Sequence, residues 1–204
     1  LVFTFSRGAW LAFILEAVIL GFWIDRRIII AIIIAAVITP AVAPTVYDRI
    51  VYMASPEYIV SSERGGRLGR WDKAMDYWRT APAFGVGLGE FGGAVAARYY
   101  PEDSFYVDNW YLKVGTETGW VGLSATLLLF IYALTQSRRA IDKIKKDKFL
   151  HHMGLGIIIG LLGVLAHNCV ENVFEVPMMA TYFWFFLGIA LALPHLTESP
   201  QKTA

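Results

Sequence analysis

The chain has 204 residues, of which 56% are hydrophobic and 17% are charged, and its formal net charge is +1. Soluble domains carry about 25% charged residues, so this composition favours a protein of the lipid bilayer. So small a net charge excludes the global basic field of many nucleic-acid-binding proteins. The single cysteine, Cys169, excludes an internal disulfide and a multi-cysteine metal site, and its apolar neighbours predict a buried thiol.

Five apolar segments approach or reach the roughly 20 residues that a helix needs to cross a bilayer. In chain order they are Gly8 to Ile24, Ile28 to Pro44, Gly119 to Gln136, Met153 to Val170 and Val176 to Leu193. The second is short and rich in Ile, which leaves a buried strand as its alternative, but its length favours a helix.

These segments predict an all-α polytopic membrane protein, with residues 1–204 forming one membrane domain. Residues 1–44 hold two of the helices, residues 108–195 hold three, and residues 196–204 form a cytoplasmic tail. Because the chain starts with Leu1 and is apolar at once, we expect it to be a fragment of a longer polypeptide.

Basic residues in short connections indicate the cytoplasmic side of a membrane protein. Arg26 and Arg27 follow the first predicted helix, and the connection from Ser137 to Lys148 holds six basic residues against two acidic ones. Alternation of the helices then places the start of the first helix, the extracytoplasmic loop 45–107 and the turn from His167 to Glu175 together on the outer face.

Within the loop 45–107, apolar residues recur at helical spacing from Arg67 to Thr80. They predict an amphipathic helix that lies on the membrane or caps the helical bundle. Its apolar residues are Leu68, Trp71, Met75 and Trp78. Pro82 ends this helix, and the glycines between Gly85 and Gly93 predict a tightly turned backbone.

Small residues form a stripe on one face of the third predicted spanning helix, where another helix is expected to pack closely. The stripe consists of Gly115, Gly119, Gly122 and Thr126. Gly156 and Gly160 repeat this spacing on the fourth predicted helix.

Three groups of motifs follow one another along the chain. Ser6-Arg7-Gly8 starts the first predicted helix; G-R-L-x-x-W (66–71) precedes P-x-x-G-x-G (82–87); and D-N-x9-G-x-x-G runs from 108 to 122. In this order and spacing they resemble the shared domain of bacterial O-antigen ligases and polysaccharide polymerases.

The resemblance implies a GT-C-like membrane glycosyltransferase that uses neither a nucleotide sugar, a cofactor nor a metal. It would transfer a glycan from undecaprenyl diphosphate to an acceptor on the outer face of the cytoplasmic membrane. Its partners would be this donor, the acceptor and the bilayer, with no nucleic acid. A ligase would use lipid A core or protein as acceptor, and a polymerase a second lipid-linked glycan.

The resemblance also assigns catalytic roles to Arg7, Arg67 and Asp108. The two arginines match family positions that hold the diphosphate, for which a planar guanidinium is well suited. Asp108 stands where the ligases carry a histidine that activates the acceptor hydroxyl, and a desolvated carboxylate can accept that proton. The alternatives are an interface anchor for Arg7 and a helix N-cap for Asp108.

Four more residues are candidates for substrate binding: Arg70, Asn109, Glu117 and His167. Arg70 also fits a solvated basic helix face, and Glu117 also fits helix packing or charge balance. His167 lies on the same predicted membrane face and is a second candidate for the missing family histidine, although a helix-end histidine is the simpler interpretation.

Two other classes of function stay open. Glu16, Pro40 and Pro44, within the first two predicted helices, favour a transporter or flippase, in which midplane charges and interrupted helices are expected. A non-catalytic membrane scaffold would need neither Arg7 nor Arg67 for glycan assembly.

Overall fold

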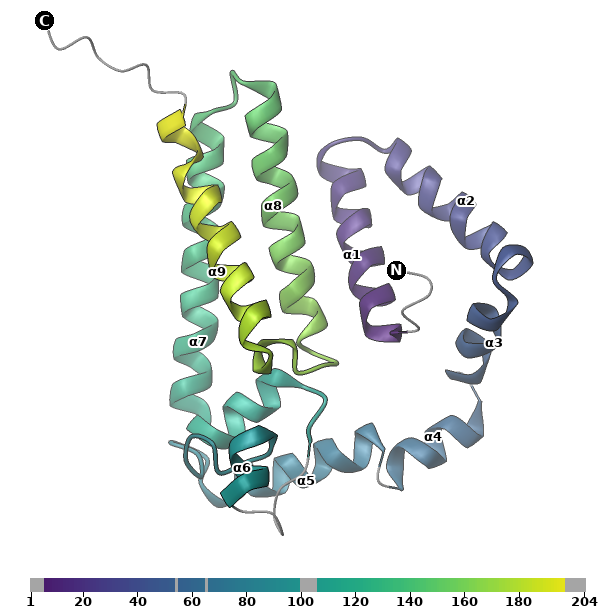
Figure 1. Cartoon of the computed structure of the whole chain (residues 1–204), viewed down its shortest axis with the longest axis vertical. Helices are drawn as coiled ribbons and strands as arrows, with labels where there is room; N and C mark the ends of the chain where they lie inside the picture. Colours follow the sequence, from purple (N-terminus) through teal and green to yellow (C-terminus); the bar gives the residue numbers. More distant parts are fainter. Residues whose placement is uncertain (1–5, 54, 65, 100–105, 197–204) are drawn as a thin grey trace, which may run out of the picture.

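The computed structural model describes residues 6–53, 55–64, 66–99 and 106–196, and over these residues the chain is helical with no strand. This confirms the all-α prediction, including a helix rather than a strand for the second apolar segment. The elements are α1 (Arg7–Trp23), α2 (Arg27–Val42), α3 (Pro44–Met53), α4 (Pro56–Glu63), α5 (Arg67–Thr80), α6 (Gly93–Tyr99), α7 (Trp110–Lys143), α8 (Lys148–His167), η2 (Val173–Glu175), α9 (Pro177–Ala192) and η3 (Leu193–Leu196) (Figure 1).

Three helices of the described part are long and apolar enough to cross a membrane, and they pack side by side as a bundle (Figure 1). They are α7, α8, and α9 together with η3. α1 and α2 are apolar helices of 17 and 16 residues. All five predicted segments are therefore helical, while the count of five spans stays a prediction. Of the predicted cytoplasmic tail, residues 197–204 lie outside the described residues.

α1 packs against α8 of the bundle, and small residues permit the close approach. A Cβ on Gly8 would lie 2.9 Å from Val170 and 3.0 Å from His167. Further along, Gly163 of α8 leaves room for the side chain of Glu16. From α1, the helices α2, α3 and α4 form an arc that leads to α5 at the end of the bundle (Figure 1).

Two groups of polar segments lie at opposite ends of the molecule (Figure 1). The α1–α2 and α7–α8 connections, both rich in basic residues, lie at the top of Figure 1. Arg138, near the second connection, lies over the ring of Trp23 at 4.9 Å. α5, α6, the start of α7 and the α8–α9 turn lie at the lower end. The polar segments are thus grouped as predicted, and the side of the membrane that each end faces stays a prediction.

α7 is bent at Gly119, whose φ of 65° and ψ of −167° belong to a region that only glycine adopts readily. The bend frees backbone groups that the glycine loop, residues 82–92, satisfies instead. Four hydrogen bonds join them, from the N–H of Val86 to Thr116, of Gly87 to Glu117, of Trp120 to Pro82 and of Val121 to Ala83. Thus the P-x-x-G-x-G motif (82–87) packs and hydrogen-bonds against the bend at Gly119, the first glycine of the G-x-x-G motif.

Another helix packs closely on the small-residue stripe of α7, as predicted: α5 lies against Gly115, and the glycine loop lies against Gly119. A Cβ on Gly115 would lie 2.5 Å from the ring of Trp78, and one on Gly119 would collide with Ala83. The predicted close helix contact at Gly156 and Gly160 is wrong for the described residues. Both line an apolar groove between α8 and α9, with nothing within 4 Å of an added Cβ.

Cys169 is exposed, so the prediction of a buried thiol is wrong. Cys169 is the second residue after the end of α8 and lies in the turn that leads to η2.

Candidate active site

α5 lies along the first half of α7 and brings two arginines to the start of that helix. Its bounds, Arg67–Thr80, are those predicted from the apolar spacing. Ala74 and Trp78 are buried against α7, and the hydroxyl of Thr116 donates to the carbonyl of Ala74 at 3.3 Å. The helix therefore caps the bundle, although Leu68, at one end of the predicted apolar stripe, is 40% exposed.

The start of α7 is fixed by its own cap and by the α8–α9 turn. Asn109 is the N-cap, and its side-chain oxygen accepts a hydrogen bond from the N–H of Leu112 at 3.0 Å. The N–H of Trp110 donates to the carbonyls of Asn168, at 2.9 Å, and Glu171, at 3.3 Å. The cap predicted as an alternative role for Asp108 thus belongs to Asn109, and the carboxylate of Asp108 pairs with α5 instead.

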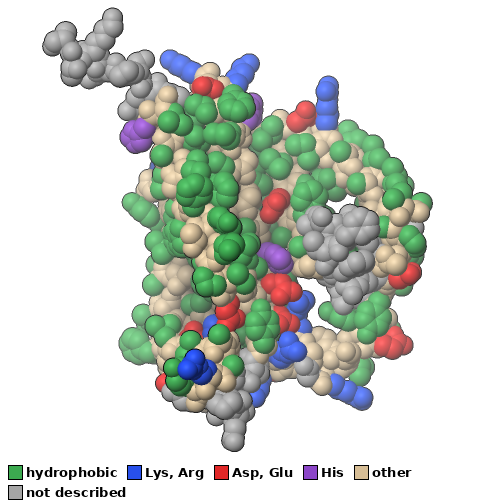
Figure 2. Space-filling view, viewed as in Figure 1, with side chains coloured by type: hydrophobic (Ala, Val, Ile, Leu, Met, Phe, Trp, Pro, Cys, Tyr) green, Lys and Arg blue, Asp and Glu red, His purple; other side chains and the backbone are tan. Residues whose placement is uncertain are grey.

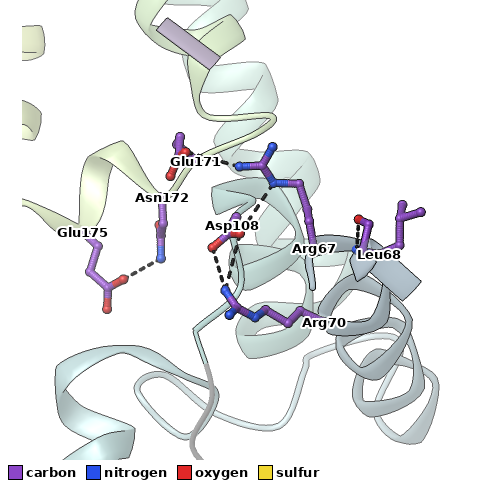
Figure 3. Close-up of polar contacts among 8 residues, drawn as sticks. Arg67, Leu68, Arg70, Asp108, Glu171, Asn172 and Glu175 are labelled. Atoms are coloured by element: carbon purple, nitrogen blue, oxygen red, sulfur yellow. Dashed lines mark hydrogen bonds and ion pairs between the residues drawn. The ribbon is translucent and has the colours of Figure 1, made fainter. Parts of the chain in front are cut away.

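Asp108 lies between the two arginines of α5, as Figure 3 shows. The Nε atom of Arg67 is 3.5 Å from Oδ2 of Asp108, and Nη1 of Arg70 is 3.3 Å from Oδ1. Nη2 of Arg67 also lies 3.2 Å from Oε1 of Glu171. We call these four residues the arginine–carboxylate cluster.

The cluster balances two positive against two negative charges in a partly dehydrated setting. Asp108 is its least accessible side chain, 16% exposed, whereas Arg70 is 40% exposed. Partly buried ion pairs need directed hydrogen bonds to offset the loss of water. Nη1 of Arg70 donates one to Asp108 and Nη2 of Arg67 donates one to Glu171, whereas Nε of Arg67 lies near Asp108 without hydrogen-bond geometry. An incoming anion with several oxygens can replace the carboxylates as partner of both arginines.

Tyr106 borders the cluster. Burial is the main cause that raises the pKa of its hydroxyl, and the negative charges of Glu171, Glu175 and Asp108 raise it further. The phenol is therefore protonated at neutral pH and can donate a hydrogen bond.

Glu117, a predicted substrate-binding residue, takes part in a different polar group. Its carboxylate lies 2.7 Å from Nζ of Lys113, and the two side chains are 8% and 14% exposed. The carboxylate also accepts from the N–H of Gly89, and Lys113 donates to the carbonyls of Phe91 and Gly92. This buried pair fastens the glycine loop to α7, so Glu117 is engaged in holding the loop.

His167 ends α8 and faces the start of α1. Its Nε2 is buried and has no hydrogen-bond partner among the described residues. The ring lies against Gly8, the residue after Arg7. Arg7 is the first residue of α1, but its side chain lies outside the described residues.

Of the predicted site residues, the structure thus brings together Arg67, Arg70 and Asp108. Two residues with important contacts had no role predicted from the sequence: Glu171 of the arginine–carboxylate cluster, and Lys113, which pairs with Glu117. Lys113 had a usable signal, because it stands four residues before Glu117 on one helix face. Glu171 had none, since its partner Arg67 is 104 residues away in the chain. In the described part of the chain, no group of three His, Cys, Asp or Glu side chains is arranged to hold a metal ion.

A family model described as O-antigen ligase matches residues 1–127, more than half of the chain. The matched part includes α1, α5, the glycine loop and the bend of α7, and with them Arg67, Arg70 and Asp108. A search of curated proteins finds no match. With its three groups of motifs inside the matched region, the chain belongs to the O-antigen ligase family.

Proposed function

We propose that this protein transfers a glycan from undecaprenyl diphosphate to an acceptor at the outer face of the cytoplasmic membrane. Family membership implies a glycan-transferring enzyme of polysaccharide assembly. The donor, the side of the membrane and the residue roles are the parts that we add. The arginine–carboxylate cluster is the observation that carries them, because it offers two guanidinium groups to one anion at the end of the molecule opposite the basic connections.

In this proposal Arg67 and Arg70 bind the diphosphate of the donor, with Arg7 as a third cation from the start of α1. Diphosphate oxygens replace Asp108 and Glu171 as partners of the arginines. The carboxylate of Asp108 is then free to accept a proton. Stabilising the charge of the departing diphosphate lowers the barrier, because that charge grows in the transition state.

The chemical step exchanges one bond for another at the anomeric carbon. The acceptor oxygen forms a bond to the anomeric carbon, while the bond from that carbon to the diphosphate oxygen breaks. The hydroxyl proton passes to Asp108, and undecaprenyl diphosphate leaves with the electron pair. His167 is the second candidate for the base, but its buried Nε2 faces α1, so Asp108 fits this role better.

The decisive experiment uses the full-length protein in lipid vesicles with an undecaprenyl-diphosphate-linked oligosaccharide. Arg67→Ala is expected to lower the rate of transfer about 100- to 1,000-fold, as loss of one charge-stabilising donor does. Asp108→Asn is expected to lower it about 100- to 10,000-fold, the usual contribution of a general base. A product ladder without added acceptor indicates a polymerase, and transfer only to added lipid A core or protein indicates a ligase.

Arg79→Ala is the matched control, since Arg79 lies on the same helix, is 73% exposed and pairs with the exposed Asp76. It should transfer at the normal rate. Full activity of folded Arg67→Ala and Asp108→Asn proteins would refute the proposed site. Passage of the lipid-linked glycan across the vesicle membrane with no transfer product would favour a flippase instead.

A further inference from the structure

The glycine loop exposes two large apolar side chains at the end of α7. Phe84 is 76% exposed and Leu88 is 80% exposed, the highest values among the large hydrophobic residues that the structure describes. Neither contributes to the core of the loop, which is formed by Ala74, Phe91 and Val107. Exposed apolar side chains of this size at a defined turn indicate a contact outside the chain.

The position of these side chains along α7 is fixed by the backbone. Hydrogen bonds from Trp120 to Pro82, at 2.9 Å, and from Val121 to Ala83, at 3.2 Å, tie the loop to the helix. Phe84 follows directly, and its backbone nitrogen lies 2.5 Å from where a Cβ on Gly119 would be, so Phe84 lies at the bend itself. Leu88 stands beside Gly89, whose N–H donates to the carboxylate of Glu117, so Leu88 also lies beside the bend.

The first turn after the bend coincides with the expected boundary of the hydrocarbon core. Trp120 precedes Arg138, at the start of the basic connection, by 18 residues. At about 1.5 Å per residue these positions are about 27 Å apart, close to the roughly 30 Å thickness of the core. Phe84 and Leu88, which both lie beside the bend, are therefore near the level where lipid tails meet headgroups.

The exposed loop residues also continue an apolar surface of α7. Trp120 is 58% exposed, Val121 is 55% exposed and Leu128, further along the span, is 65% exposed. Figure 2 shows hydrophobic side chains around the lower end of this helix. Exposed apolar side chains are thus present both along the span and on the glycine loop that adjoins its first residues.

We propose that the glycine loop inserts its tip, Phe84 and Leu88, into the leaflet of the bilayer that adjoins the arginine–carboxylate cluster. The bilayer is the partner, because the apolar surface of the spanning helix leads directly to the tip. Insertion fixes the depth of the loop in the membrane. Because Lys113 and Glu117 tie the loop to the first half of α7, insertion also holds in place the start of this helix, which follows Asp108. The inference concerns membrane contact alone and holds or fails independently of glycan transfer.

Nitroxide accessibility tests it in a cysteine-free form of the full-length protein, with Cys169→Ser in this chain. Single variants Phe84→Cys and Leu88→Cys are spin-labelled in lipid vesicles, and collisions with oxygen, which enters lipid, are compared with those of a water-soluble nickel chelate. Leu128→Cys provides the lipid reference. Asp76→Cys provides the water reference, since Asp76 is 70% exposed on the face of α5 opposite Ala74 and Trp78.

The oxygen-to-nickel collision ratio is expected to be highest at Leu128 and lowest at Asp76, with Phe84 and Leu88 between them and several-fold above Asp76. A ratio at either loop position equal to that of Asp76 would overturn the proposal. So would a label that neither reagent reaches, because the tip would then be covered by protein. All four positions are exposed, so the substitutions leave packing intact, and a single peak in size-exclusion chromatography checks the fold.

Discussion

Arg67 is the side chain that joins the separate parts of the cluster. Its guanidinium reaches Asp108, which precedes α7, and Glu171, which follows α8. A planar fork can donate in two directions at once, whereas an ammonium is a single point of charge on a flexible stem. The kind of cation at this position is therefore as important as its charge.

Replacing Arg67 with Lys is expected to weaken donor binding although the charge is kept. Loss of one hydrogen bond to a charged group costs about 1.5–3 kcal/mol, which corresponds to roughly a 10- to 100-fold rise in the KM for the lipid-linked donor. Transfer rates at varied donor concentration measure this effect. Arg79→Lys serves as the control, and an unchanged KM in Arg67→Lys would show that the fork is not needed.

Lys113 and Glu117 form the most buried ion pair of the described residues, and removing one partner leaves the other charge without compensation. Glu117→Ala is expected to destabilise the protein by about 3–5 kcal/mol. Lys113→Met combined with Glu117→Met should be milder, because no buried charge remains. Thermal unfolding in detergent measures both, with Asp76→Ala as the exposed control, and equal losses in the single and double variants would contradict the argument.

At the scale of elements, the bend of α7 and the glycine loop depend on each other. The bend removes intrahelical hydrogen bonds at Thr116, Glu117, Trp120 and Val121, and the loop restores a partner to each. Gly119 is required twice, for its positive φ and for its contact with Ala83. The loop also provides the carbonyl groups of Phe91 and Gly92 to which Lys113 donates. A change that displaces the loop from the bend is therefore expected to weaken the Lys113–Glu117 ion pair as well.

Gly119→Ala is expected to lower stability and activity together. The backbone conformation alone costs a residue with a side chain on the order of 1–3 kcal/mol, and the collision with Ala83 adds to this. Gly160→Ala is the matched control, because an added Cβ there meets nothing within 4 Å and alanine favours a helix. Thermal unfolding and transfer assays of both variants check the prediction, which fails if they behave alike.

At the scale of the whole molecule, the two polar ends define a direction across the membrane. The basic connections lie at one end and the arginine–carboxylate cluster lies at the other (Figure 1). Cys169 follows α8 at the cluster end and is exposed, so it is a natural probe of sidedness. Partial desolvation of the thiol raises its pKa, which lowers the fraction of reactive thiolate at neutral pH.

If the cluster faces outwards, a membrane-impermeant maleimide should label Cys169 in intact cells whose outer membrane has been opened. Because its pKa is raised, the thiol loses its proton only in more alkaline solution, so labelling should keep accelerating as the pH rises through about 9. Lys145→Cys combined with Cys169→Ser is the control, since Lys145 lies in the α7–α8 connection and is 63% exposed. That variant should react only after the inner membrane is permeabilised, and the reverse pattern would invert the topology.

The sequence by itself determined the features that depend on neighbouring residues. Apolar length and spacing predicted helices, including the bounds of α5, because helix formation and burial of one face are governed by residues three and four apart. The motifs around Arg67, Pro82 and Asp108 were recognisable for the same reason. The basic connections also predicted which polar segments share an end, since charge distribution is read directly from the chain.

Only the tertiary structure decided which of these groups meet. The pairing of Arg67 with Glu171, the hydrogen bonds from the glycine loop to α7 and the exposure of Cys169 all depend on how α5, α7 and the α8–α9 turn dock. Such contacts join residues far apart in the chain, so no local pattern encodes them. They form because unsatisfied backbone groups and partly buried charges need partners, and docking is what brings those partners within reach.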